Sequence, residues 1–355
     1  MGSIRNLFLF PWILAALISF AVTPLVIKFA KKLGIIDYPK KLAKVIHTVP
    51  TPRGGGIPVF AALVICSLIF LPFDKQLIGI LSGALILVVM GYLDDKYDLN
   101  PYLRLFLGFV AAAAPIAAGI GIAFISNPLG GIIDLSHPQL VINFFGTHSI
   151  WILSDLFALF WITFLMNIVN MGAKGVDGQM SGVTVIAALT IAFLSLRFSA
   201  DITQWPVIIL AAITAGAYMG FLPWHIYPQK IMPGYGGSTL AGYLLAILSI
   251  LSTTKVGALV VVLGVPLIDT GYTIIRRVLT GKSPVWGDRG HLHHRLLDAG
   301  FSKNQVALFY WAITAVLGFA ALNLNTTTKI YTMVGVAVLL GGLIIWLTYR
   351  PKKII

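Results

Sequence analysis

Three aspartates stand close together at the end of one apolar run. The segment from Gly91 to Pro101 places Asp94 and Asp98 four residues apart, and therefore on one face of a helix. Carboxylates this close repel one another, so beside a membrane they persist where a cation or a proton uses them. We interpret Asp94, Asp95 and Asp98 as candidate catalytic residues. A solvated cluster of loop acids is the alternative.

A second polar stretch, residues 167–182, follows another apolar segment. It holds Asn170, Lys174 and Asp177 in a glycine-rich context. Backbone N–H groups exposed by glycines, beside a lysine, can hold a diphosphate. A helix C-cap followed by a turn explains the same residues.

The third stretch concentrates basic side chains. Seven consecutive positions hold three histidines and two arginines, and an aspartate precedes them: Asp288, Arg289, His291, His293, His294 and Arg295. The His-x-His-His spacing is crowded for zinc and lacks a distant partner set, so phosphate binding is the better interpretation. An unstructured basic loop is the alternative.

Three weaker features complete the set. Lys44, His47 and Arg53 form a basic, glycine-rich entry to the apolar run 57–73. The segment 228–238 combines glycines with a helix start, which suits an anion site. Asp269 lies inside an apolar segment, where a carboxylate is costly and rarely without a function. An internally hydrogen-bonded structural aspartate is the alternative reading of Asp269.

The elements that must position these residues are apolar helices. The chain has 355 residues, of which 58% are hydrophobic and 10% charged, and its mean hydropathy is +0.92. Soluble domains are nearer to about a quarter charged, and a bilayer-spanning helix needs about 20 mainly apolar residues. With Cys66 as the sole cysteine, a disulfide scaffold is excluded together with a soluble globule. We predict an all-α polytopic membrane protein that forms a single domain over residues 1–355.

Eleven hydrophobic segments are predicted to cross the bilayer. They span residues 7–27, 57–73, 77–93, 103–124, 151–169, 183–198, 206–223, 239–251, 256–275, 305–322 and 330–349. With a cytoplasmic C-terminus, 20 Lys and Arg lie on the cytoplasmic side and 5 outside, so the positive-inside rule puts the N-terminus outside. The basic excess then reflects topology, and no nucleic-acid partner is implied. The longest outer loop, 125–150, is expected to contain a short hairpin.

This topology gathers the candidate residues on one side. The cytoplasmic loops hold seven of the 12 aspartates and five of the 7 histidines. We predict that five loops form a cytoplasmic active site: 28–56, 94–102, 170–182, 224–238 and 276–304.

Taken in order, these motifs resemble the polyprenyl-phosphate N-acetylhexosamine-1-phosphate transferases, glycosyltransferase family 4. The resemblance runs from Asp37 to Gly300. It rests on Asp-Asp-x-x-Asp, on Asn-x-x-Asn followed by Gly-x-Asp-Gly, and on His-Leu-His-His-Arg-Leu-Leu. The last motif is similar to the N-acetylglucosamine-phosphate branch, whereas the muramyl-pentapeptide branch carries a different histidine run.

The resemblance implies an enzyme of the plasma membrane whose active site faces the cytoplasm. Such enzymes transfer a sugar-1-phosphate from a UDP-N-acetylhexosamine to a polyprenyl phosphate and release UMP. Their products lead to cell-wall, lipopolysaccharide or teichoic-acid glycans, and relatives suggest a homodimer.

The resemblance also implies roles for individual residues. Asp94 would be the base or orienter for the lipid phosphate, with Asp95 and Asp98 shaping the charge of the site. Mg²⁺, or Mn²⁺ in its place, would be held by Asn170 together with Asp94 and Asp95. Contacts to the nucleotide sugar or the lipid phosphate would come from Lys44, His47, Arg53, Lys174, Asp177, Asp288, Arg289, His291, His293, His294 and Arg295. Asp269 joins these candidate substrate-binding residues on the strength of its place within a span.

Four positions depart from the family pattern. Lys174 stands where the first Asp of Asp-Gly-x-Asp-Gly is expected, and Tyr235 where relatives carry a magnesium-binding Asp. His225 and Val45 replace an Asn and a basic residue. Loss of a carboxylate should weaken an ion held there, while Lys174 can supply positive charge. We expect an active enzyme with a raised magnesium requirement.

Two other classes of function compete with this one. A carrier or flippase for an anionic lipid or a nucleotide sugar is suggested by the basic cytoplasmic face. Carriers usually show paired broken helices in two related halves, and the sequence shows neither. A catalytically weakened relative is suggested by Tyr235.

Overall fold

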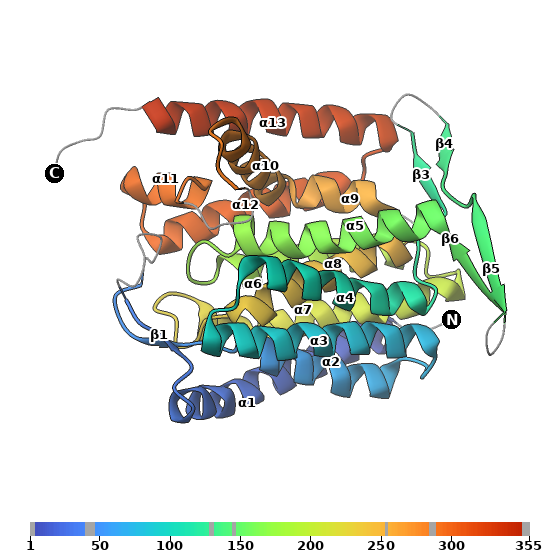
Figure 1. The fold of residues 1–355 in the computed structure, drawn as a ribbon, viewed down its shortest axis with the longest axis horizontal. Helices are drawn as coiled ribbons and strands as arrows, with labels where there is room; N and C mark the ends of the chain where they lie inside the picture. The colour runs from blue at the N-terminus through green and yellow to red at the C-terminus, as the bar shows by residue number, and fades with distance from the viewer. Residues whose placement is uncertain are drawn as a thin grey trace.

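The chain folds as a bundle of helices with three small hairpins in the computed structural model (Figure 1). The structure describes residues 4–39, 47–127, 131–143, 147–252, 255–283 and 289–349. Within these residues, eight helices are long and apolar enough to cross a membrane, and nine if one bent pair counts as a span. The all-α prediction is confirmed, and the chain is a multi-pass membrane protein.

The long helices begin and end near the predicted boundaries. Their bounds are α1 Phe10–Lys32, α3 Lys75–Tyr97, α5 Ile152–Ile168, α6 Gln179–Leu196, α7 Trp205–His225, α8 Gly234–Leu251, α12 Lys303–Ala321 and α13 Thr326–Tyr349. Short π- or 3₁₀-helical turns extend three of them: η1 Arg5–Leu9, η2 Val169–Ala173 and η3 Ile202–Gln204.

Shorter helices occupy the remaining apolar segments. The helices α2 (Gly56–Phe70) and α4 (Pro101–Ala117) are apolar but shorter than a usual span. The helices α9 (Lys255–Val262) and α10 (Gly264–Leu279) form the pair that is bent by 81°. Every predicted segment therefore contains a helix or this pair. A further short helix, α11 (Leu292–Asp298), lies in a stretch predicted as loop.

Capping residues determine where several helices begin. Asp74 accepts the N–H of Leu77 at 2.8 Å at the start of α3. At the start of α4, the side chain of Asn100 accepts a backbone N–H and Pro101 occupies the first turn. A capping box begins α12. These capping residues therefore fix where each of the three helices begins.

The helices lie side by side, with their ends at two opposite faces of the bundle (Figure 1). The central helix α8 contacts α2, α3, α5, α6, α7 and α9, and 94% of its most apolar stretch is buried. The helix α13 lies at the edge of the bundle, and only 11% of its corresponding stretch is buried. The core therefore surrounds α8.

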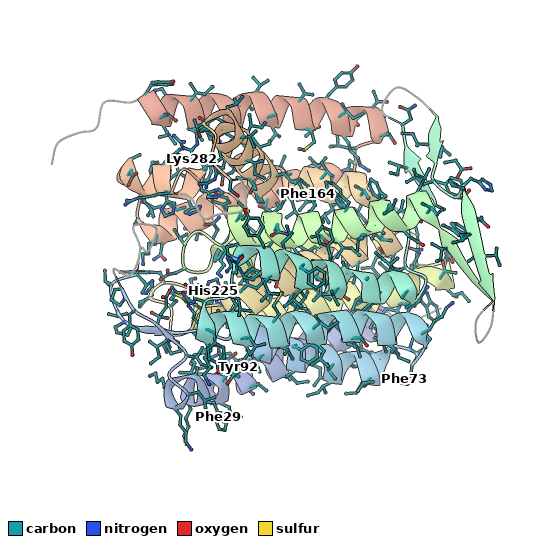
Figure 2. The ribbon with its side chains drawn as sticks, viewed as in Figure 1. Phe29, Phe73, Tyr92, Phe164, His225 and Lys282 are labelled. Atoms are coloured by element: carbon teal, nitrogen blue, oxygen red, sulfur yellow. The ribbon has the colours of Figure 1, made fainter. Side chains whose placement is uncertain are left out.

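The hairpins distinguish the two ends of the bundle. At one end lie β3 (Phe124–Ser126) with β4 (Ile132–Asp134), and β5 (Gln139–Asn143) with β6 (Thr147–Trp151). The loop 125–150, which was predicted to lie outside, thus carries two hairpins where one was expected. At the other end, β1 (Ile36–Asp37) pairs with β2 (Thr51–Pro52). Tyr92 and His225 lie at this second end, and Phe73 lies at the first (Figure 2).

Candidate active site

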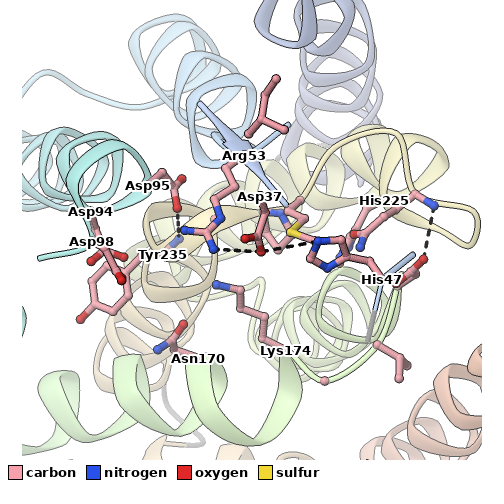
Figure 3. Close-up of a pocket in the computed structure, with 18 of the residues that line it drawn as sticks. Asp37, His47, Arg53, Asp94, Asp95, Asp98, Asn170, Lys174, His225 and Tyr235 are labelled. Carbon is pink, nitrogen blue, oxygen red and sulfur yellow. Dashed lines mark hydrogen bonds and ion pairs between the residues drawn. The ribbon is translucent and has the colours of Figure 1, made fainter. Parts of the chain in front are cut away.

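A cavity of about 470 Å³ lies at the end of the bundle that carries β1 and α11. Its lining draws residues from each of the five loops in which the sequence predicts a site. The predicted site residues that line it are His47, Arg53, Asp94, Asp95, Asp98, Asn170, Lys174, Asp177, His291, His293 and His294. Figure 3 shows the carboxylates of α3 facing Arg53 and Lys174 across this space.

The aspartates of α3 have three different environments. Asp94 is 4% exposed, and its two oxygens accept from Nη1 of Arg104 at 3.1 and 3.2 Å. Asp95 is half-buried and accepts the backbone N–H of Tyr235 at 3.2 Å. Asp98 ends the helix in the left-handed region, with φ +53°, and its side chain is exposed at the rim. The predicted cluster is therefore divided among an ion pair, a backbone contact and a helix cap.

Glycines bring α3 and α8 into backbone contact beside Asp95. A Cβ on Gly91 would lie 2.3 Å from Cα of Gly236, and a Cβ on Gly234 would lie 2.0 Å from Oδ2 of Asp95. Gly234 also has φ +67°, which side-chain-bearing residues rarely adopt. This packing places the N–H of Tyr235 on Asp95. The glycines of 228–238, interpreted from the sequence as an anion site, serve helix packing here.

Arg104 is a pocket residue that the sequence analysis did not select. Its guanidinium pairs with Asp94 and lies 5.0 Å from the ring centroid of Tyr235. Asn100 and Pro101 lie at the turn between α3 and α4, and α4 packs back against α3. Arg104 therefore faces Asp94. The Asn-Pro pair was the available signal, because it fixes where the second helix starts.

Asn170 lies in the turn η2 that extends α5, and Lys174 follows it before α6. Lys174 is half-buried in the pocket wall, and burial lowers the pKa of its ammonium to about 8, although the charge of Asp95 opposes this shift. Oδ1 of Asn170 accepts the hydroxyl of Ser238 at 2.7 Å. Gln179 stabilises the loop that follows Lys174, because its Oε1 accepts the N–H of Val176 at 3.0 Å.

Asp177 joins this loop to two other elements. It is 3% exposed, lies 3.6 Å from Nζ of Lys303 at the start of α12, and accepts the N–H of Gln229 at 3.4 Å. Asp177 thus fixes the pocket wall between α7 and α8. Gln229 was not among the predicted residues.

A third ion pair closes the side of the pocket formed by β1 and β2. Asp37 accepts from Nη2 of Arg53 at 2.9 Å, and Nε2 of His47 lies 3.9 Å away (Figure 3). Strand pairing aligns Asp37 with Thr51, which brings the two loop ends together. Asp37 was not selected from the sequence, because this pairing joins residues that no local motif connects.

Asp269 holds the histidine segment, residues 291–294, in place through two hydrogen bonds. It is 1% exposed, and its Oδ2 accepts Nδ1–H of His291 at 2.9 Å while its Oδ1 accepts the N–H of Leu292 at 2.6 Å. Asp269 does not line the cavity, so its contact is with the histidine segment. Asp269 is therefore internally hydrogen-bonded, as the structural alternative expected, and substrate binding by Asp269 stays a prediction.

His293 and His294 are buried pocket residues that stay neutral near pH 7. Burial lowers the pKa of His294 to about 4 and that of His293 well below its usual value. Among the described residues, neither Nδ1 atom has a hydrogen-bond partner. His225, a further lining residue, has its Nδ1 2.8 Å from Oγ of Ser181.

Arg289 and Arg295 were also predicted, but they do not line the cavity. Arg289 is exposed and pairs with Asp298 at 3.2 Å. Nε of Arg295 donates to the carbonyl of Gly290 at 2.9 Å, and its guanidinium lies over Tyr272. Lys44, Val45 and Asp288 lie outside the described residues.

The side chains predicted to hold magnesium do not fit a protein-held ion. Among the described residues, no three His, Cys, Asp or Glu side chains converge as metal ligands. The oxygens of Asp94 and Asn170 already accept from a guanidinium and a hydroxyl. Mg²⁺ demands near-octahedral oxygen ligands, and of the three predicted side chains only Asp95 has neither an ion pair nor a hydrogen bond to another side chain within the described residues. The magnesium expectation stays a prediction.

Comparison with known proteins gives a consistent family. The model of the family "Glycosyl transferase family 4" matches residues 77–253. A probable undecaprenyl-phosphate N-acetylglucosaminyl 1-phosphate transferase of Bacillus subtilis is 30% identical, over 89% of this chain and 85% of its own length. A decaprenyl-phosphate N-acetylglucosaminephosphotransferase of Mycobacterium tuberculosis is 28% identical over 92% and 85%. A phospho-N-acetylmuramoyl-pentapeptide-transferase of Caldanaerobacter subterraneus is 29% identical over 76% and 83%.

Proposed function

Because the chain belongs to glycosyl transferase family 4, we propose that it transfers an N-acetylhexosamine-1-phosphate from a UDP-sugar to a polyprenyl phosphate. The products are the polyprenyl-diphosphate sugar and UMP. N-acetylglucosamine is the proposed sugar, because the relatives from Bacillus and Mycobacterium are named for it. The sequence His291–Leu297 favours the same branch.

The observation that carries this proposal is the pocket at the helix ends. It combines carboxylates, ammonium and guanidinium groups and neutral imidazoles at one face of a membrane protein. Phosphoryl transfer needs cations around spreading negative charge and an in-line nucleophile. A lipid-linked acceptor keeps its phosphate at the bilayer surface. A polar pocket at the ends of membrane-spanning helices can therefore receive both substrates.

The reaction exchanges one phosphoanhydride bond for another. An oxygen of the polyprenyl phosphate attacks the sugar-bearing phosphorus, and the bond from that phosphorus to the oxygen shared with UMP breaks. The acceptor oxygen is already anionic near pH 7, so orientation and charge compensation dominate the barrier. We assign these tasks to the pocket's charged groups.

The contacts suggest how the residues divide this work. Lys174 and Arg53 face the space between the loops and would receive the diphosphate. Asp94 holds Arg104, while Asp95, which is more exposed, would orient the acceptor phosphate or its counter-charge. The neutral imidazoles of His293 and His294 would donate hydrogen bonds to the sugar or to phosphate oxygens.

The proposed function requires a defined topology. We propose eleven crossings, with α2, α4 and the α9–α10 pair completing the eight long spans, and with the pocket facing the cytoplasm of the cell in the plasma membrane. The distribution of 20 basic residues against 5 supports this orientation. A reporter fused after Ile355 should read cytoplasmic, and an external reading would reverse the orientation. The product would begin a lipid-linked glycan of the cell envelope.

A direct assay tests the activity. The purified protein in lipid nanodiscs receives UDP-N-acetylglucosamine and undecaprenyl phosphate, and UMP release is measured together with the lipid product. Omission of the lipid is the control, and UDP-N-acetylgalactosamine tests the sugar. UMP release that requires the lipid supports the proposal. Movement of intact UDP-sugar into proteoliposomes without UMP release would instead support a carrier.

A further inference from the structure

The acidic residues of the pocket wall are mostly matched by basic side chains of the protein itself. Three of the five aspartates in the lining form ion pairs, and their carboxylates are nearly buried: Asp37 with Arg53 at 2.9 Å, Asp94 with Arg104 at 3.1 Å and Asp177 with Lys303 at 3.6 Å. A divalent cation is held by carboxylates whose charge is not already compensated. These three aspartates do not provide such charge, which leaves Asp95 and Asp98 as the lining carboxylates outside an ion pair in the described part of the chain.

Lys174 is placed differently from the three paired cations. No carboxylate lies within 4.0 Å of its Nζ in the described part of the chain, although Asp95 and Asp94 act on it electrostatically. Figure 3 shows its ammonium pointing into the pocket beside Arg53. An ammonium carries three N–H donors and takes no hydrogen bond itself. Lys174 is therefore poised to donate to an anion.

Tyr235 places a neutral ring on the same wall, beside the guanidinium that pairs with Asp94. Tyr235 occupies the first turn of α8, and its ring lies 5.0 Å from the guanidinium of Arg104. Because Asp94 already compensates the charge of Arg104, a divalent ion on this wall would be repelled mainly by Lys174, and in a partly dehydrated pocket such repulsion is weakly screened. An anionic diphosphate would be attracted by Lys174.

We propose that side-chain cations, with Lys174 foremost, bind the diphosphate of the nucleotide sugar in this pocket, and that this binding does not require a divalent ion. The inference rests on the proposed function for the identity of the ligand. It goes beyond that function by assigning to Lys174 the charge compensation that a bound Mg²⁺ supplies in metal-dependent transfer.

Binding of UDP-N-acetylglucosamine to the full-length protein in nanodiscs tests the inference. The affinity is measured by calorimetry in EDTA and in excess Mg²⁺, for the parent chain and for Lys174→Met, which keeps the length and removes the charge. Lys32→Met at the exposed end of α1 is the matched control. Thermal unfolding of each variant confirms that the comparison is made on folded protein.

We expect the parent to bind with dissociation constants in EDTA and in Mg²⁺ that agree within about threefold. Lys174→Met should weaken binding in EDTA by about 10- to 100-fold, the range for one charge-assisted donor, and Lys32→Met should not. If Mg²⁺ is needed for binding, or if Lys174→Met binds like the parent in EDTA, the inference is wrong while the proposed function stands. If no nucleotide sugar binds under either condition, both are overturned.

Discussion

The two ends of the bundle use aspartate in different ways. At the hairpin end, Asp74, Asp134, Asp155 and Asp201 each accept a backbone N–H no more than four residues away. At the pocket end, Asp94, Asp95, Asp177 and Asp269 accept hydrogen bonds from partners between 10 and 140 residues away. The first arrangement caps a local turn or helix, whereas the second exists only when distant helices have packed.

This difference separates residues that shape the chain locally from residues that depend on the whole fold. A helix cap contributes about 1 kcal/mol wherever the helix occurs. A buried carboxylate that contacts a distant element constrains how two helices meet, and leaving its partner unpaired costs more. Substitutions at the two ends should therefore affect different measurements.

The largest effect is expected at Asp95. Asp95→Asn keeps the side-chain shape but removes a charge facing the reacting phosphates, so UMP release should fall by about 10²–10³-fold. Asp94→Asn should lower turnover by a similar factor, because it releases Arg104. Asp201→Asn at the hairpin end is the matched control and should stay within about twofold of the parent. Parental rates in Asp95→Asn would remove this residue from the mechanism.

The next effect concerns Asp269, which acts through the histidine segment. Asp269→Asn should lower kcat/KM by about 10- to 100-fold, because a buried charge-assisted hydrogen bond to His291 is lost. The double variant with His291→Ala should be no slower than His291→Ala alone, since both act on one contact. Additive losses in this cycle would show that Asp269 has a separate role. Arg295→Ala should lose less activity than His293→Ala, because Arg295 does not line the cavity and His293 does.

The next prediction concerns Tyr235 and the response of nucleotide-sugar binding to Mg²⁺. Tyr235→Asp introduces a carboxylate beside Arg104 and opposite Lys174, so a divalent ion gains a ligand. Nucleotide-sugar binding by this variant should tighten on addition of Mg²⁺ by about tenfold, for roughly one added ligand interaction. Tyr97→Asp, an exposed residue at the end of α3, serves as the control. An identical response of both variants would contradict this role for position 235.

A moderate effect of pH is expected from Lys174. Because burial lowers the pKa of its ammonium to about 8, the free pocket loses this charge as the pH rises through 8. The value of kcat/KM should therefore decline above pH 8, while kcat at saturating substrate should decline less, since a bound diphosphate favours the charged form. In Lys174→Arg, the alkaline decline should move upward, because a guanidinium stays protonated. An unchanged profile would assign the decline to another group.

The smallest effect on activity is expected at Asp74. Asp74→Ala removes the cap of α3 and should cost about 1 kcal/mol of stability. Its KM and kcat should match those of the parent, because the capped end lies across the bundle from the pocket. Thermal unfolding and UMP release measure the two quantities separately. A large loss of turnover without loss of stability would contradict the view that aspartates at the hairpin end only cap local structure.

The helices were largely predictable because the signals for them are local. Long apolar runs, Asp74, Asn100 with Pro101, and Ser302 with Gln305 fix where helices begin, and they stand close in the sequence. The motif residues of the pocket were found for the same reason. Hairpin pairing in the loop 125–150 was underestimated because strand pairing depends on register between separate segments.

The pocket contacts were less predictable because they join distant segments. Asp37 reaches Arg53 only through the pairing of β1 with β2, and Asp95 meets Tyr235 only where two glycine-bearing helices touch. The division of the α3 aspartates between an ion pair and a backbone contact follows from this packing. The sequence therefore predicted most of the charged residues that reach the pocket. The fold determines which of them are paired within the protein and which can contact a ligand.

The burial of α8 has a consequence for how the chain enters the bilayer. Its most apolar stretch has a hydropathy of 1.4, against 2.3 for α13, yet α8 is the more deeply enclosed of the two. Lipid therefore contacts almost none of α8, and its tyrosines, glycines and hydroxyl groups face other helices. The segment that begins at the pocket is thus a poor membrane anchor by itself. Its insertion is secured by the neighbours that surround it, so the site is completed during assembly of the bundle.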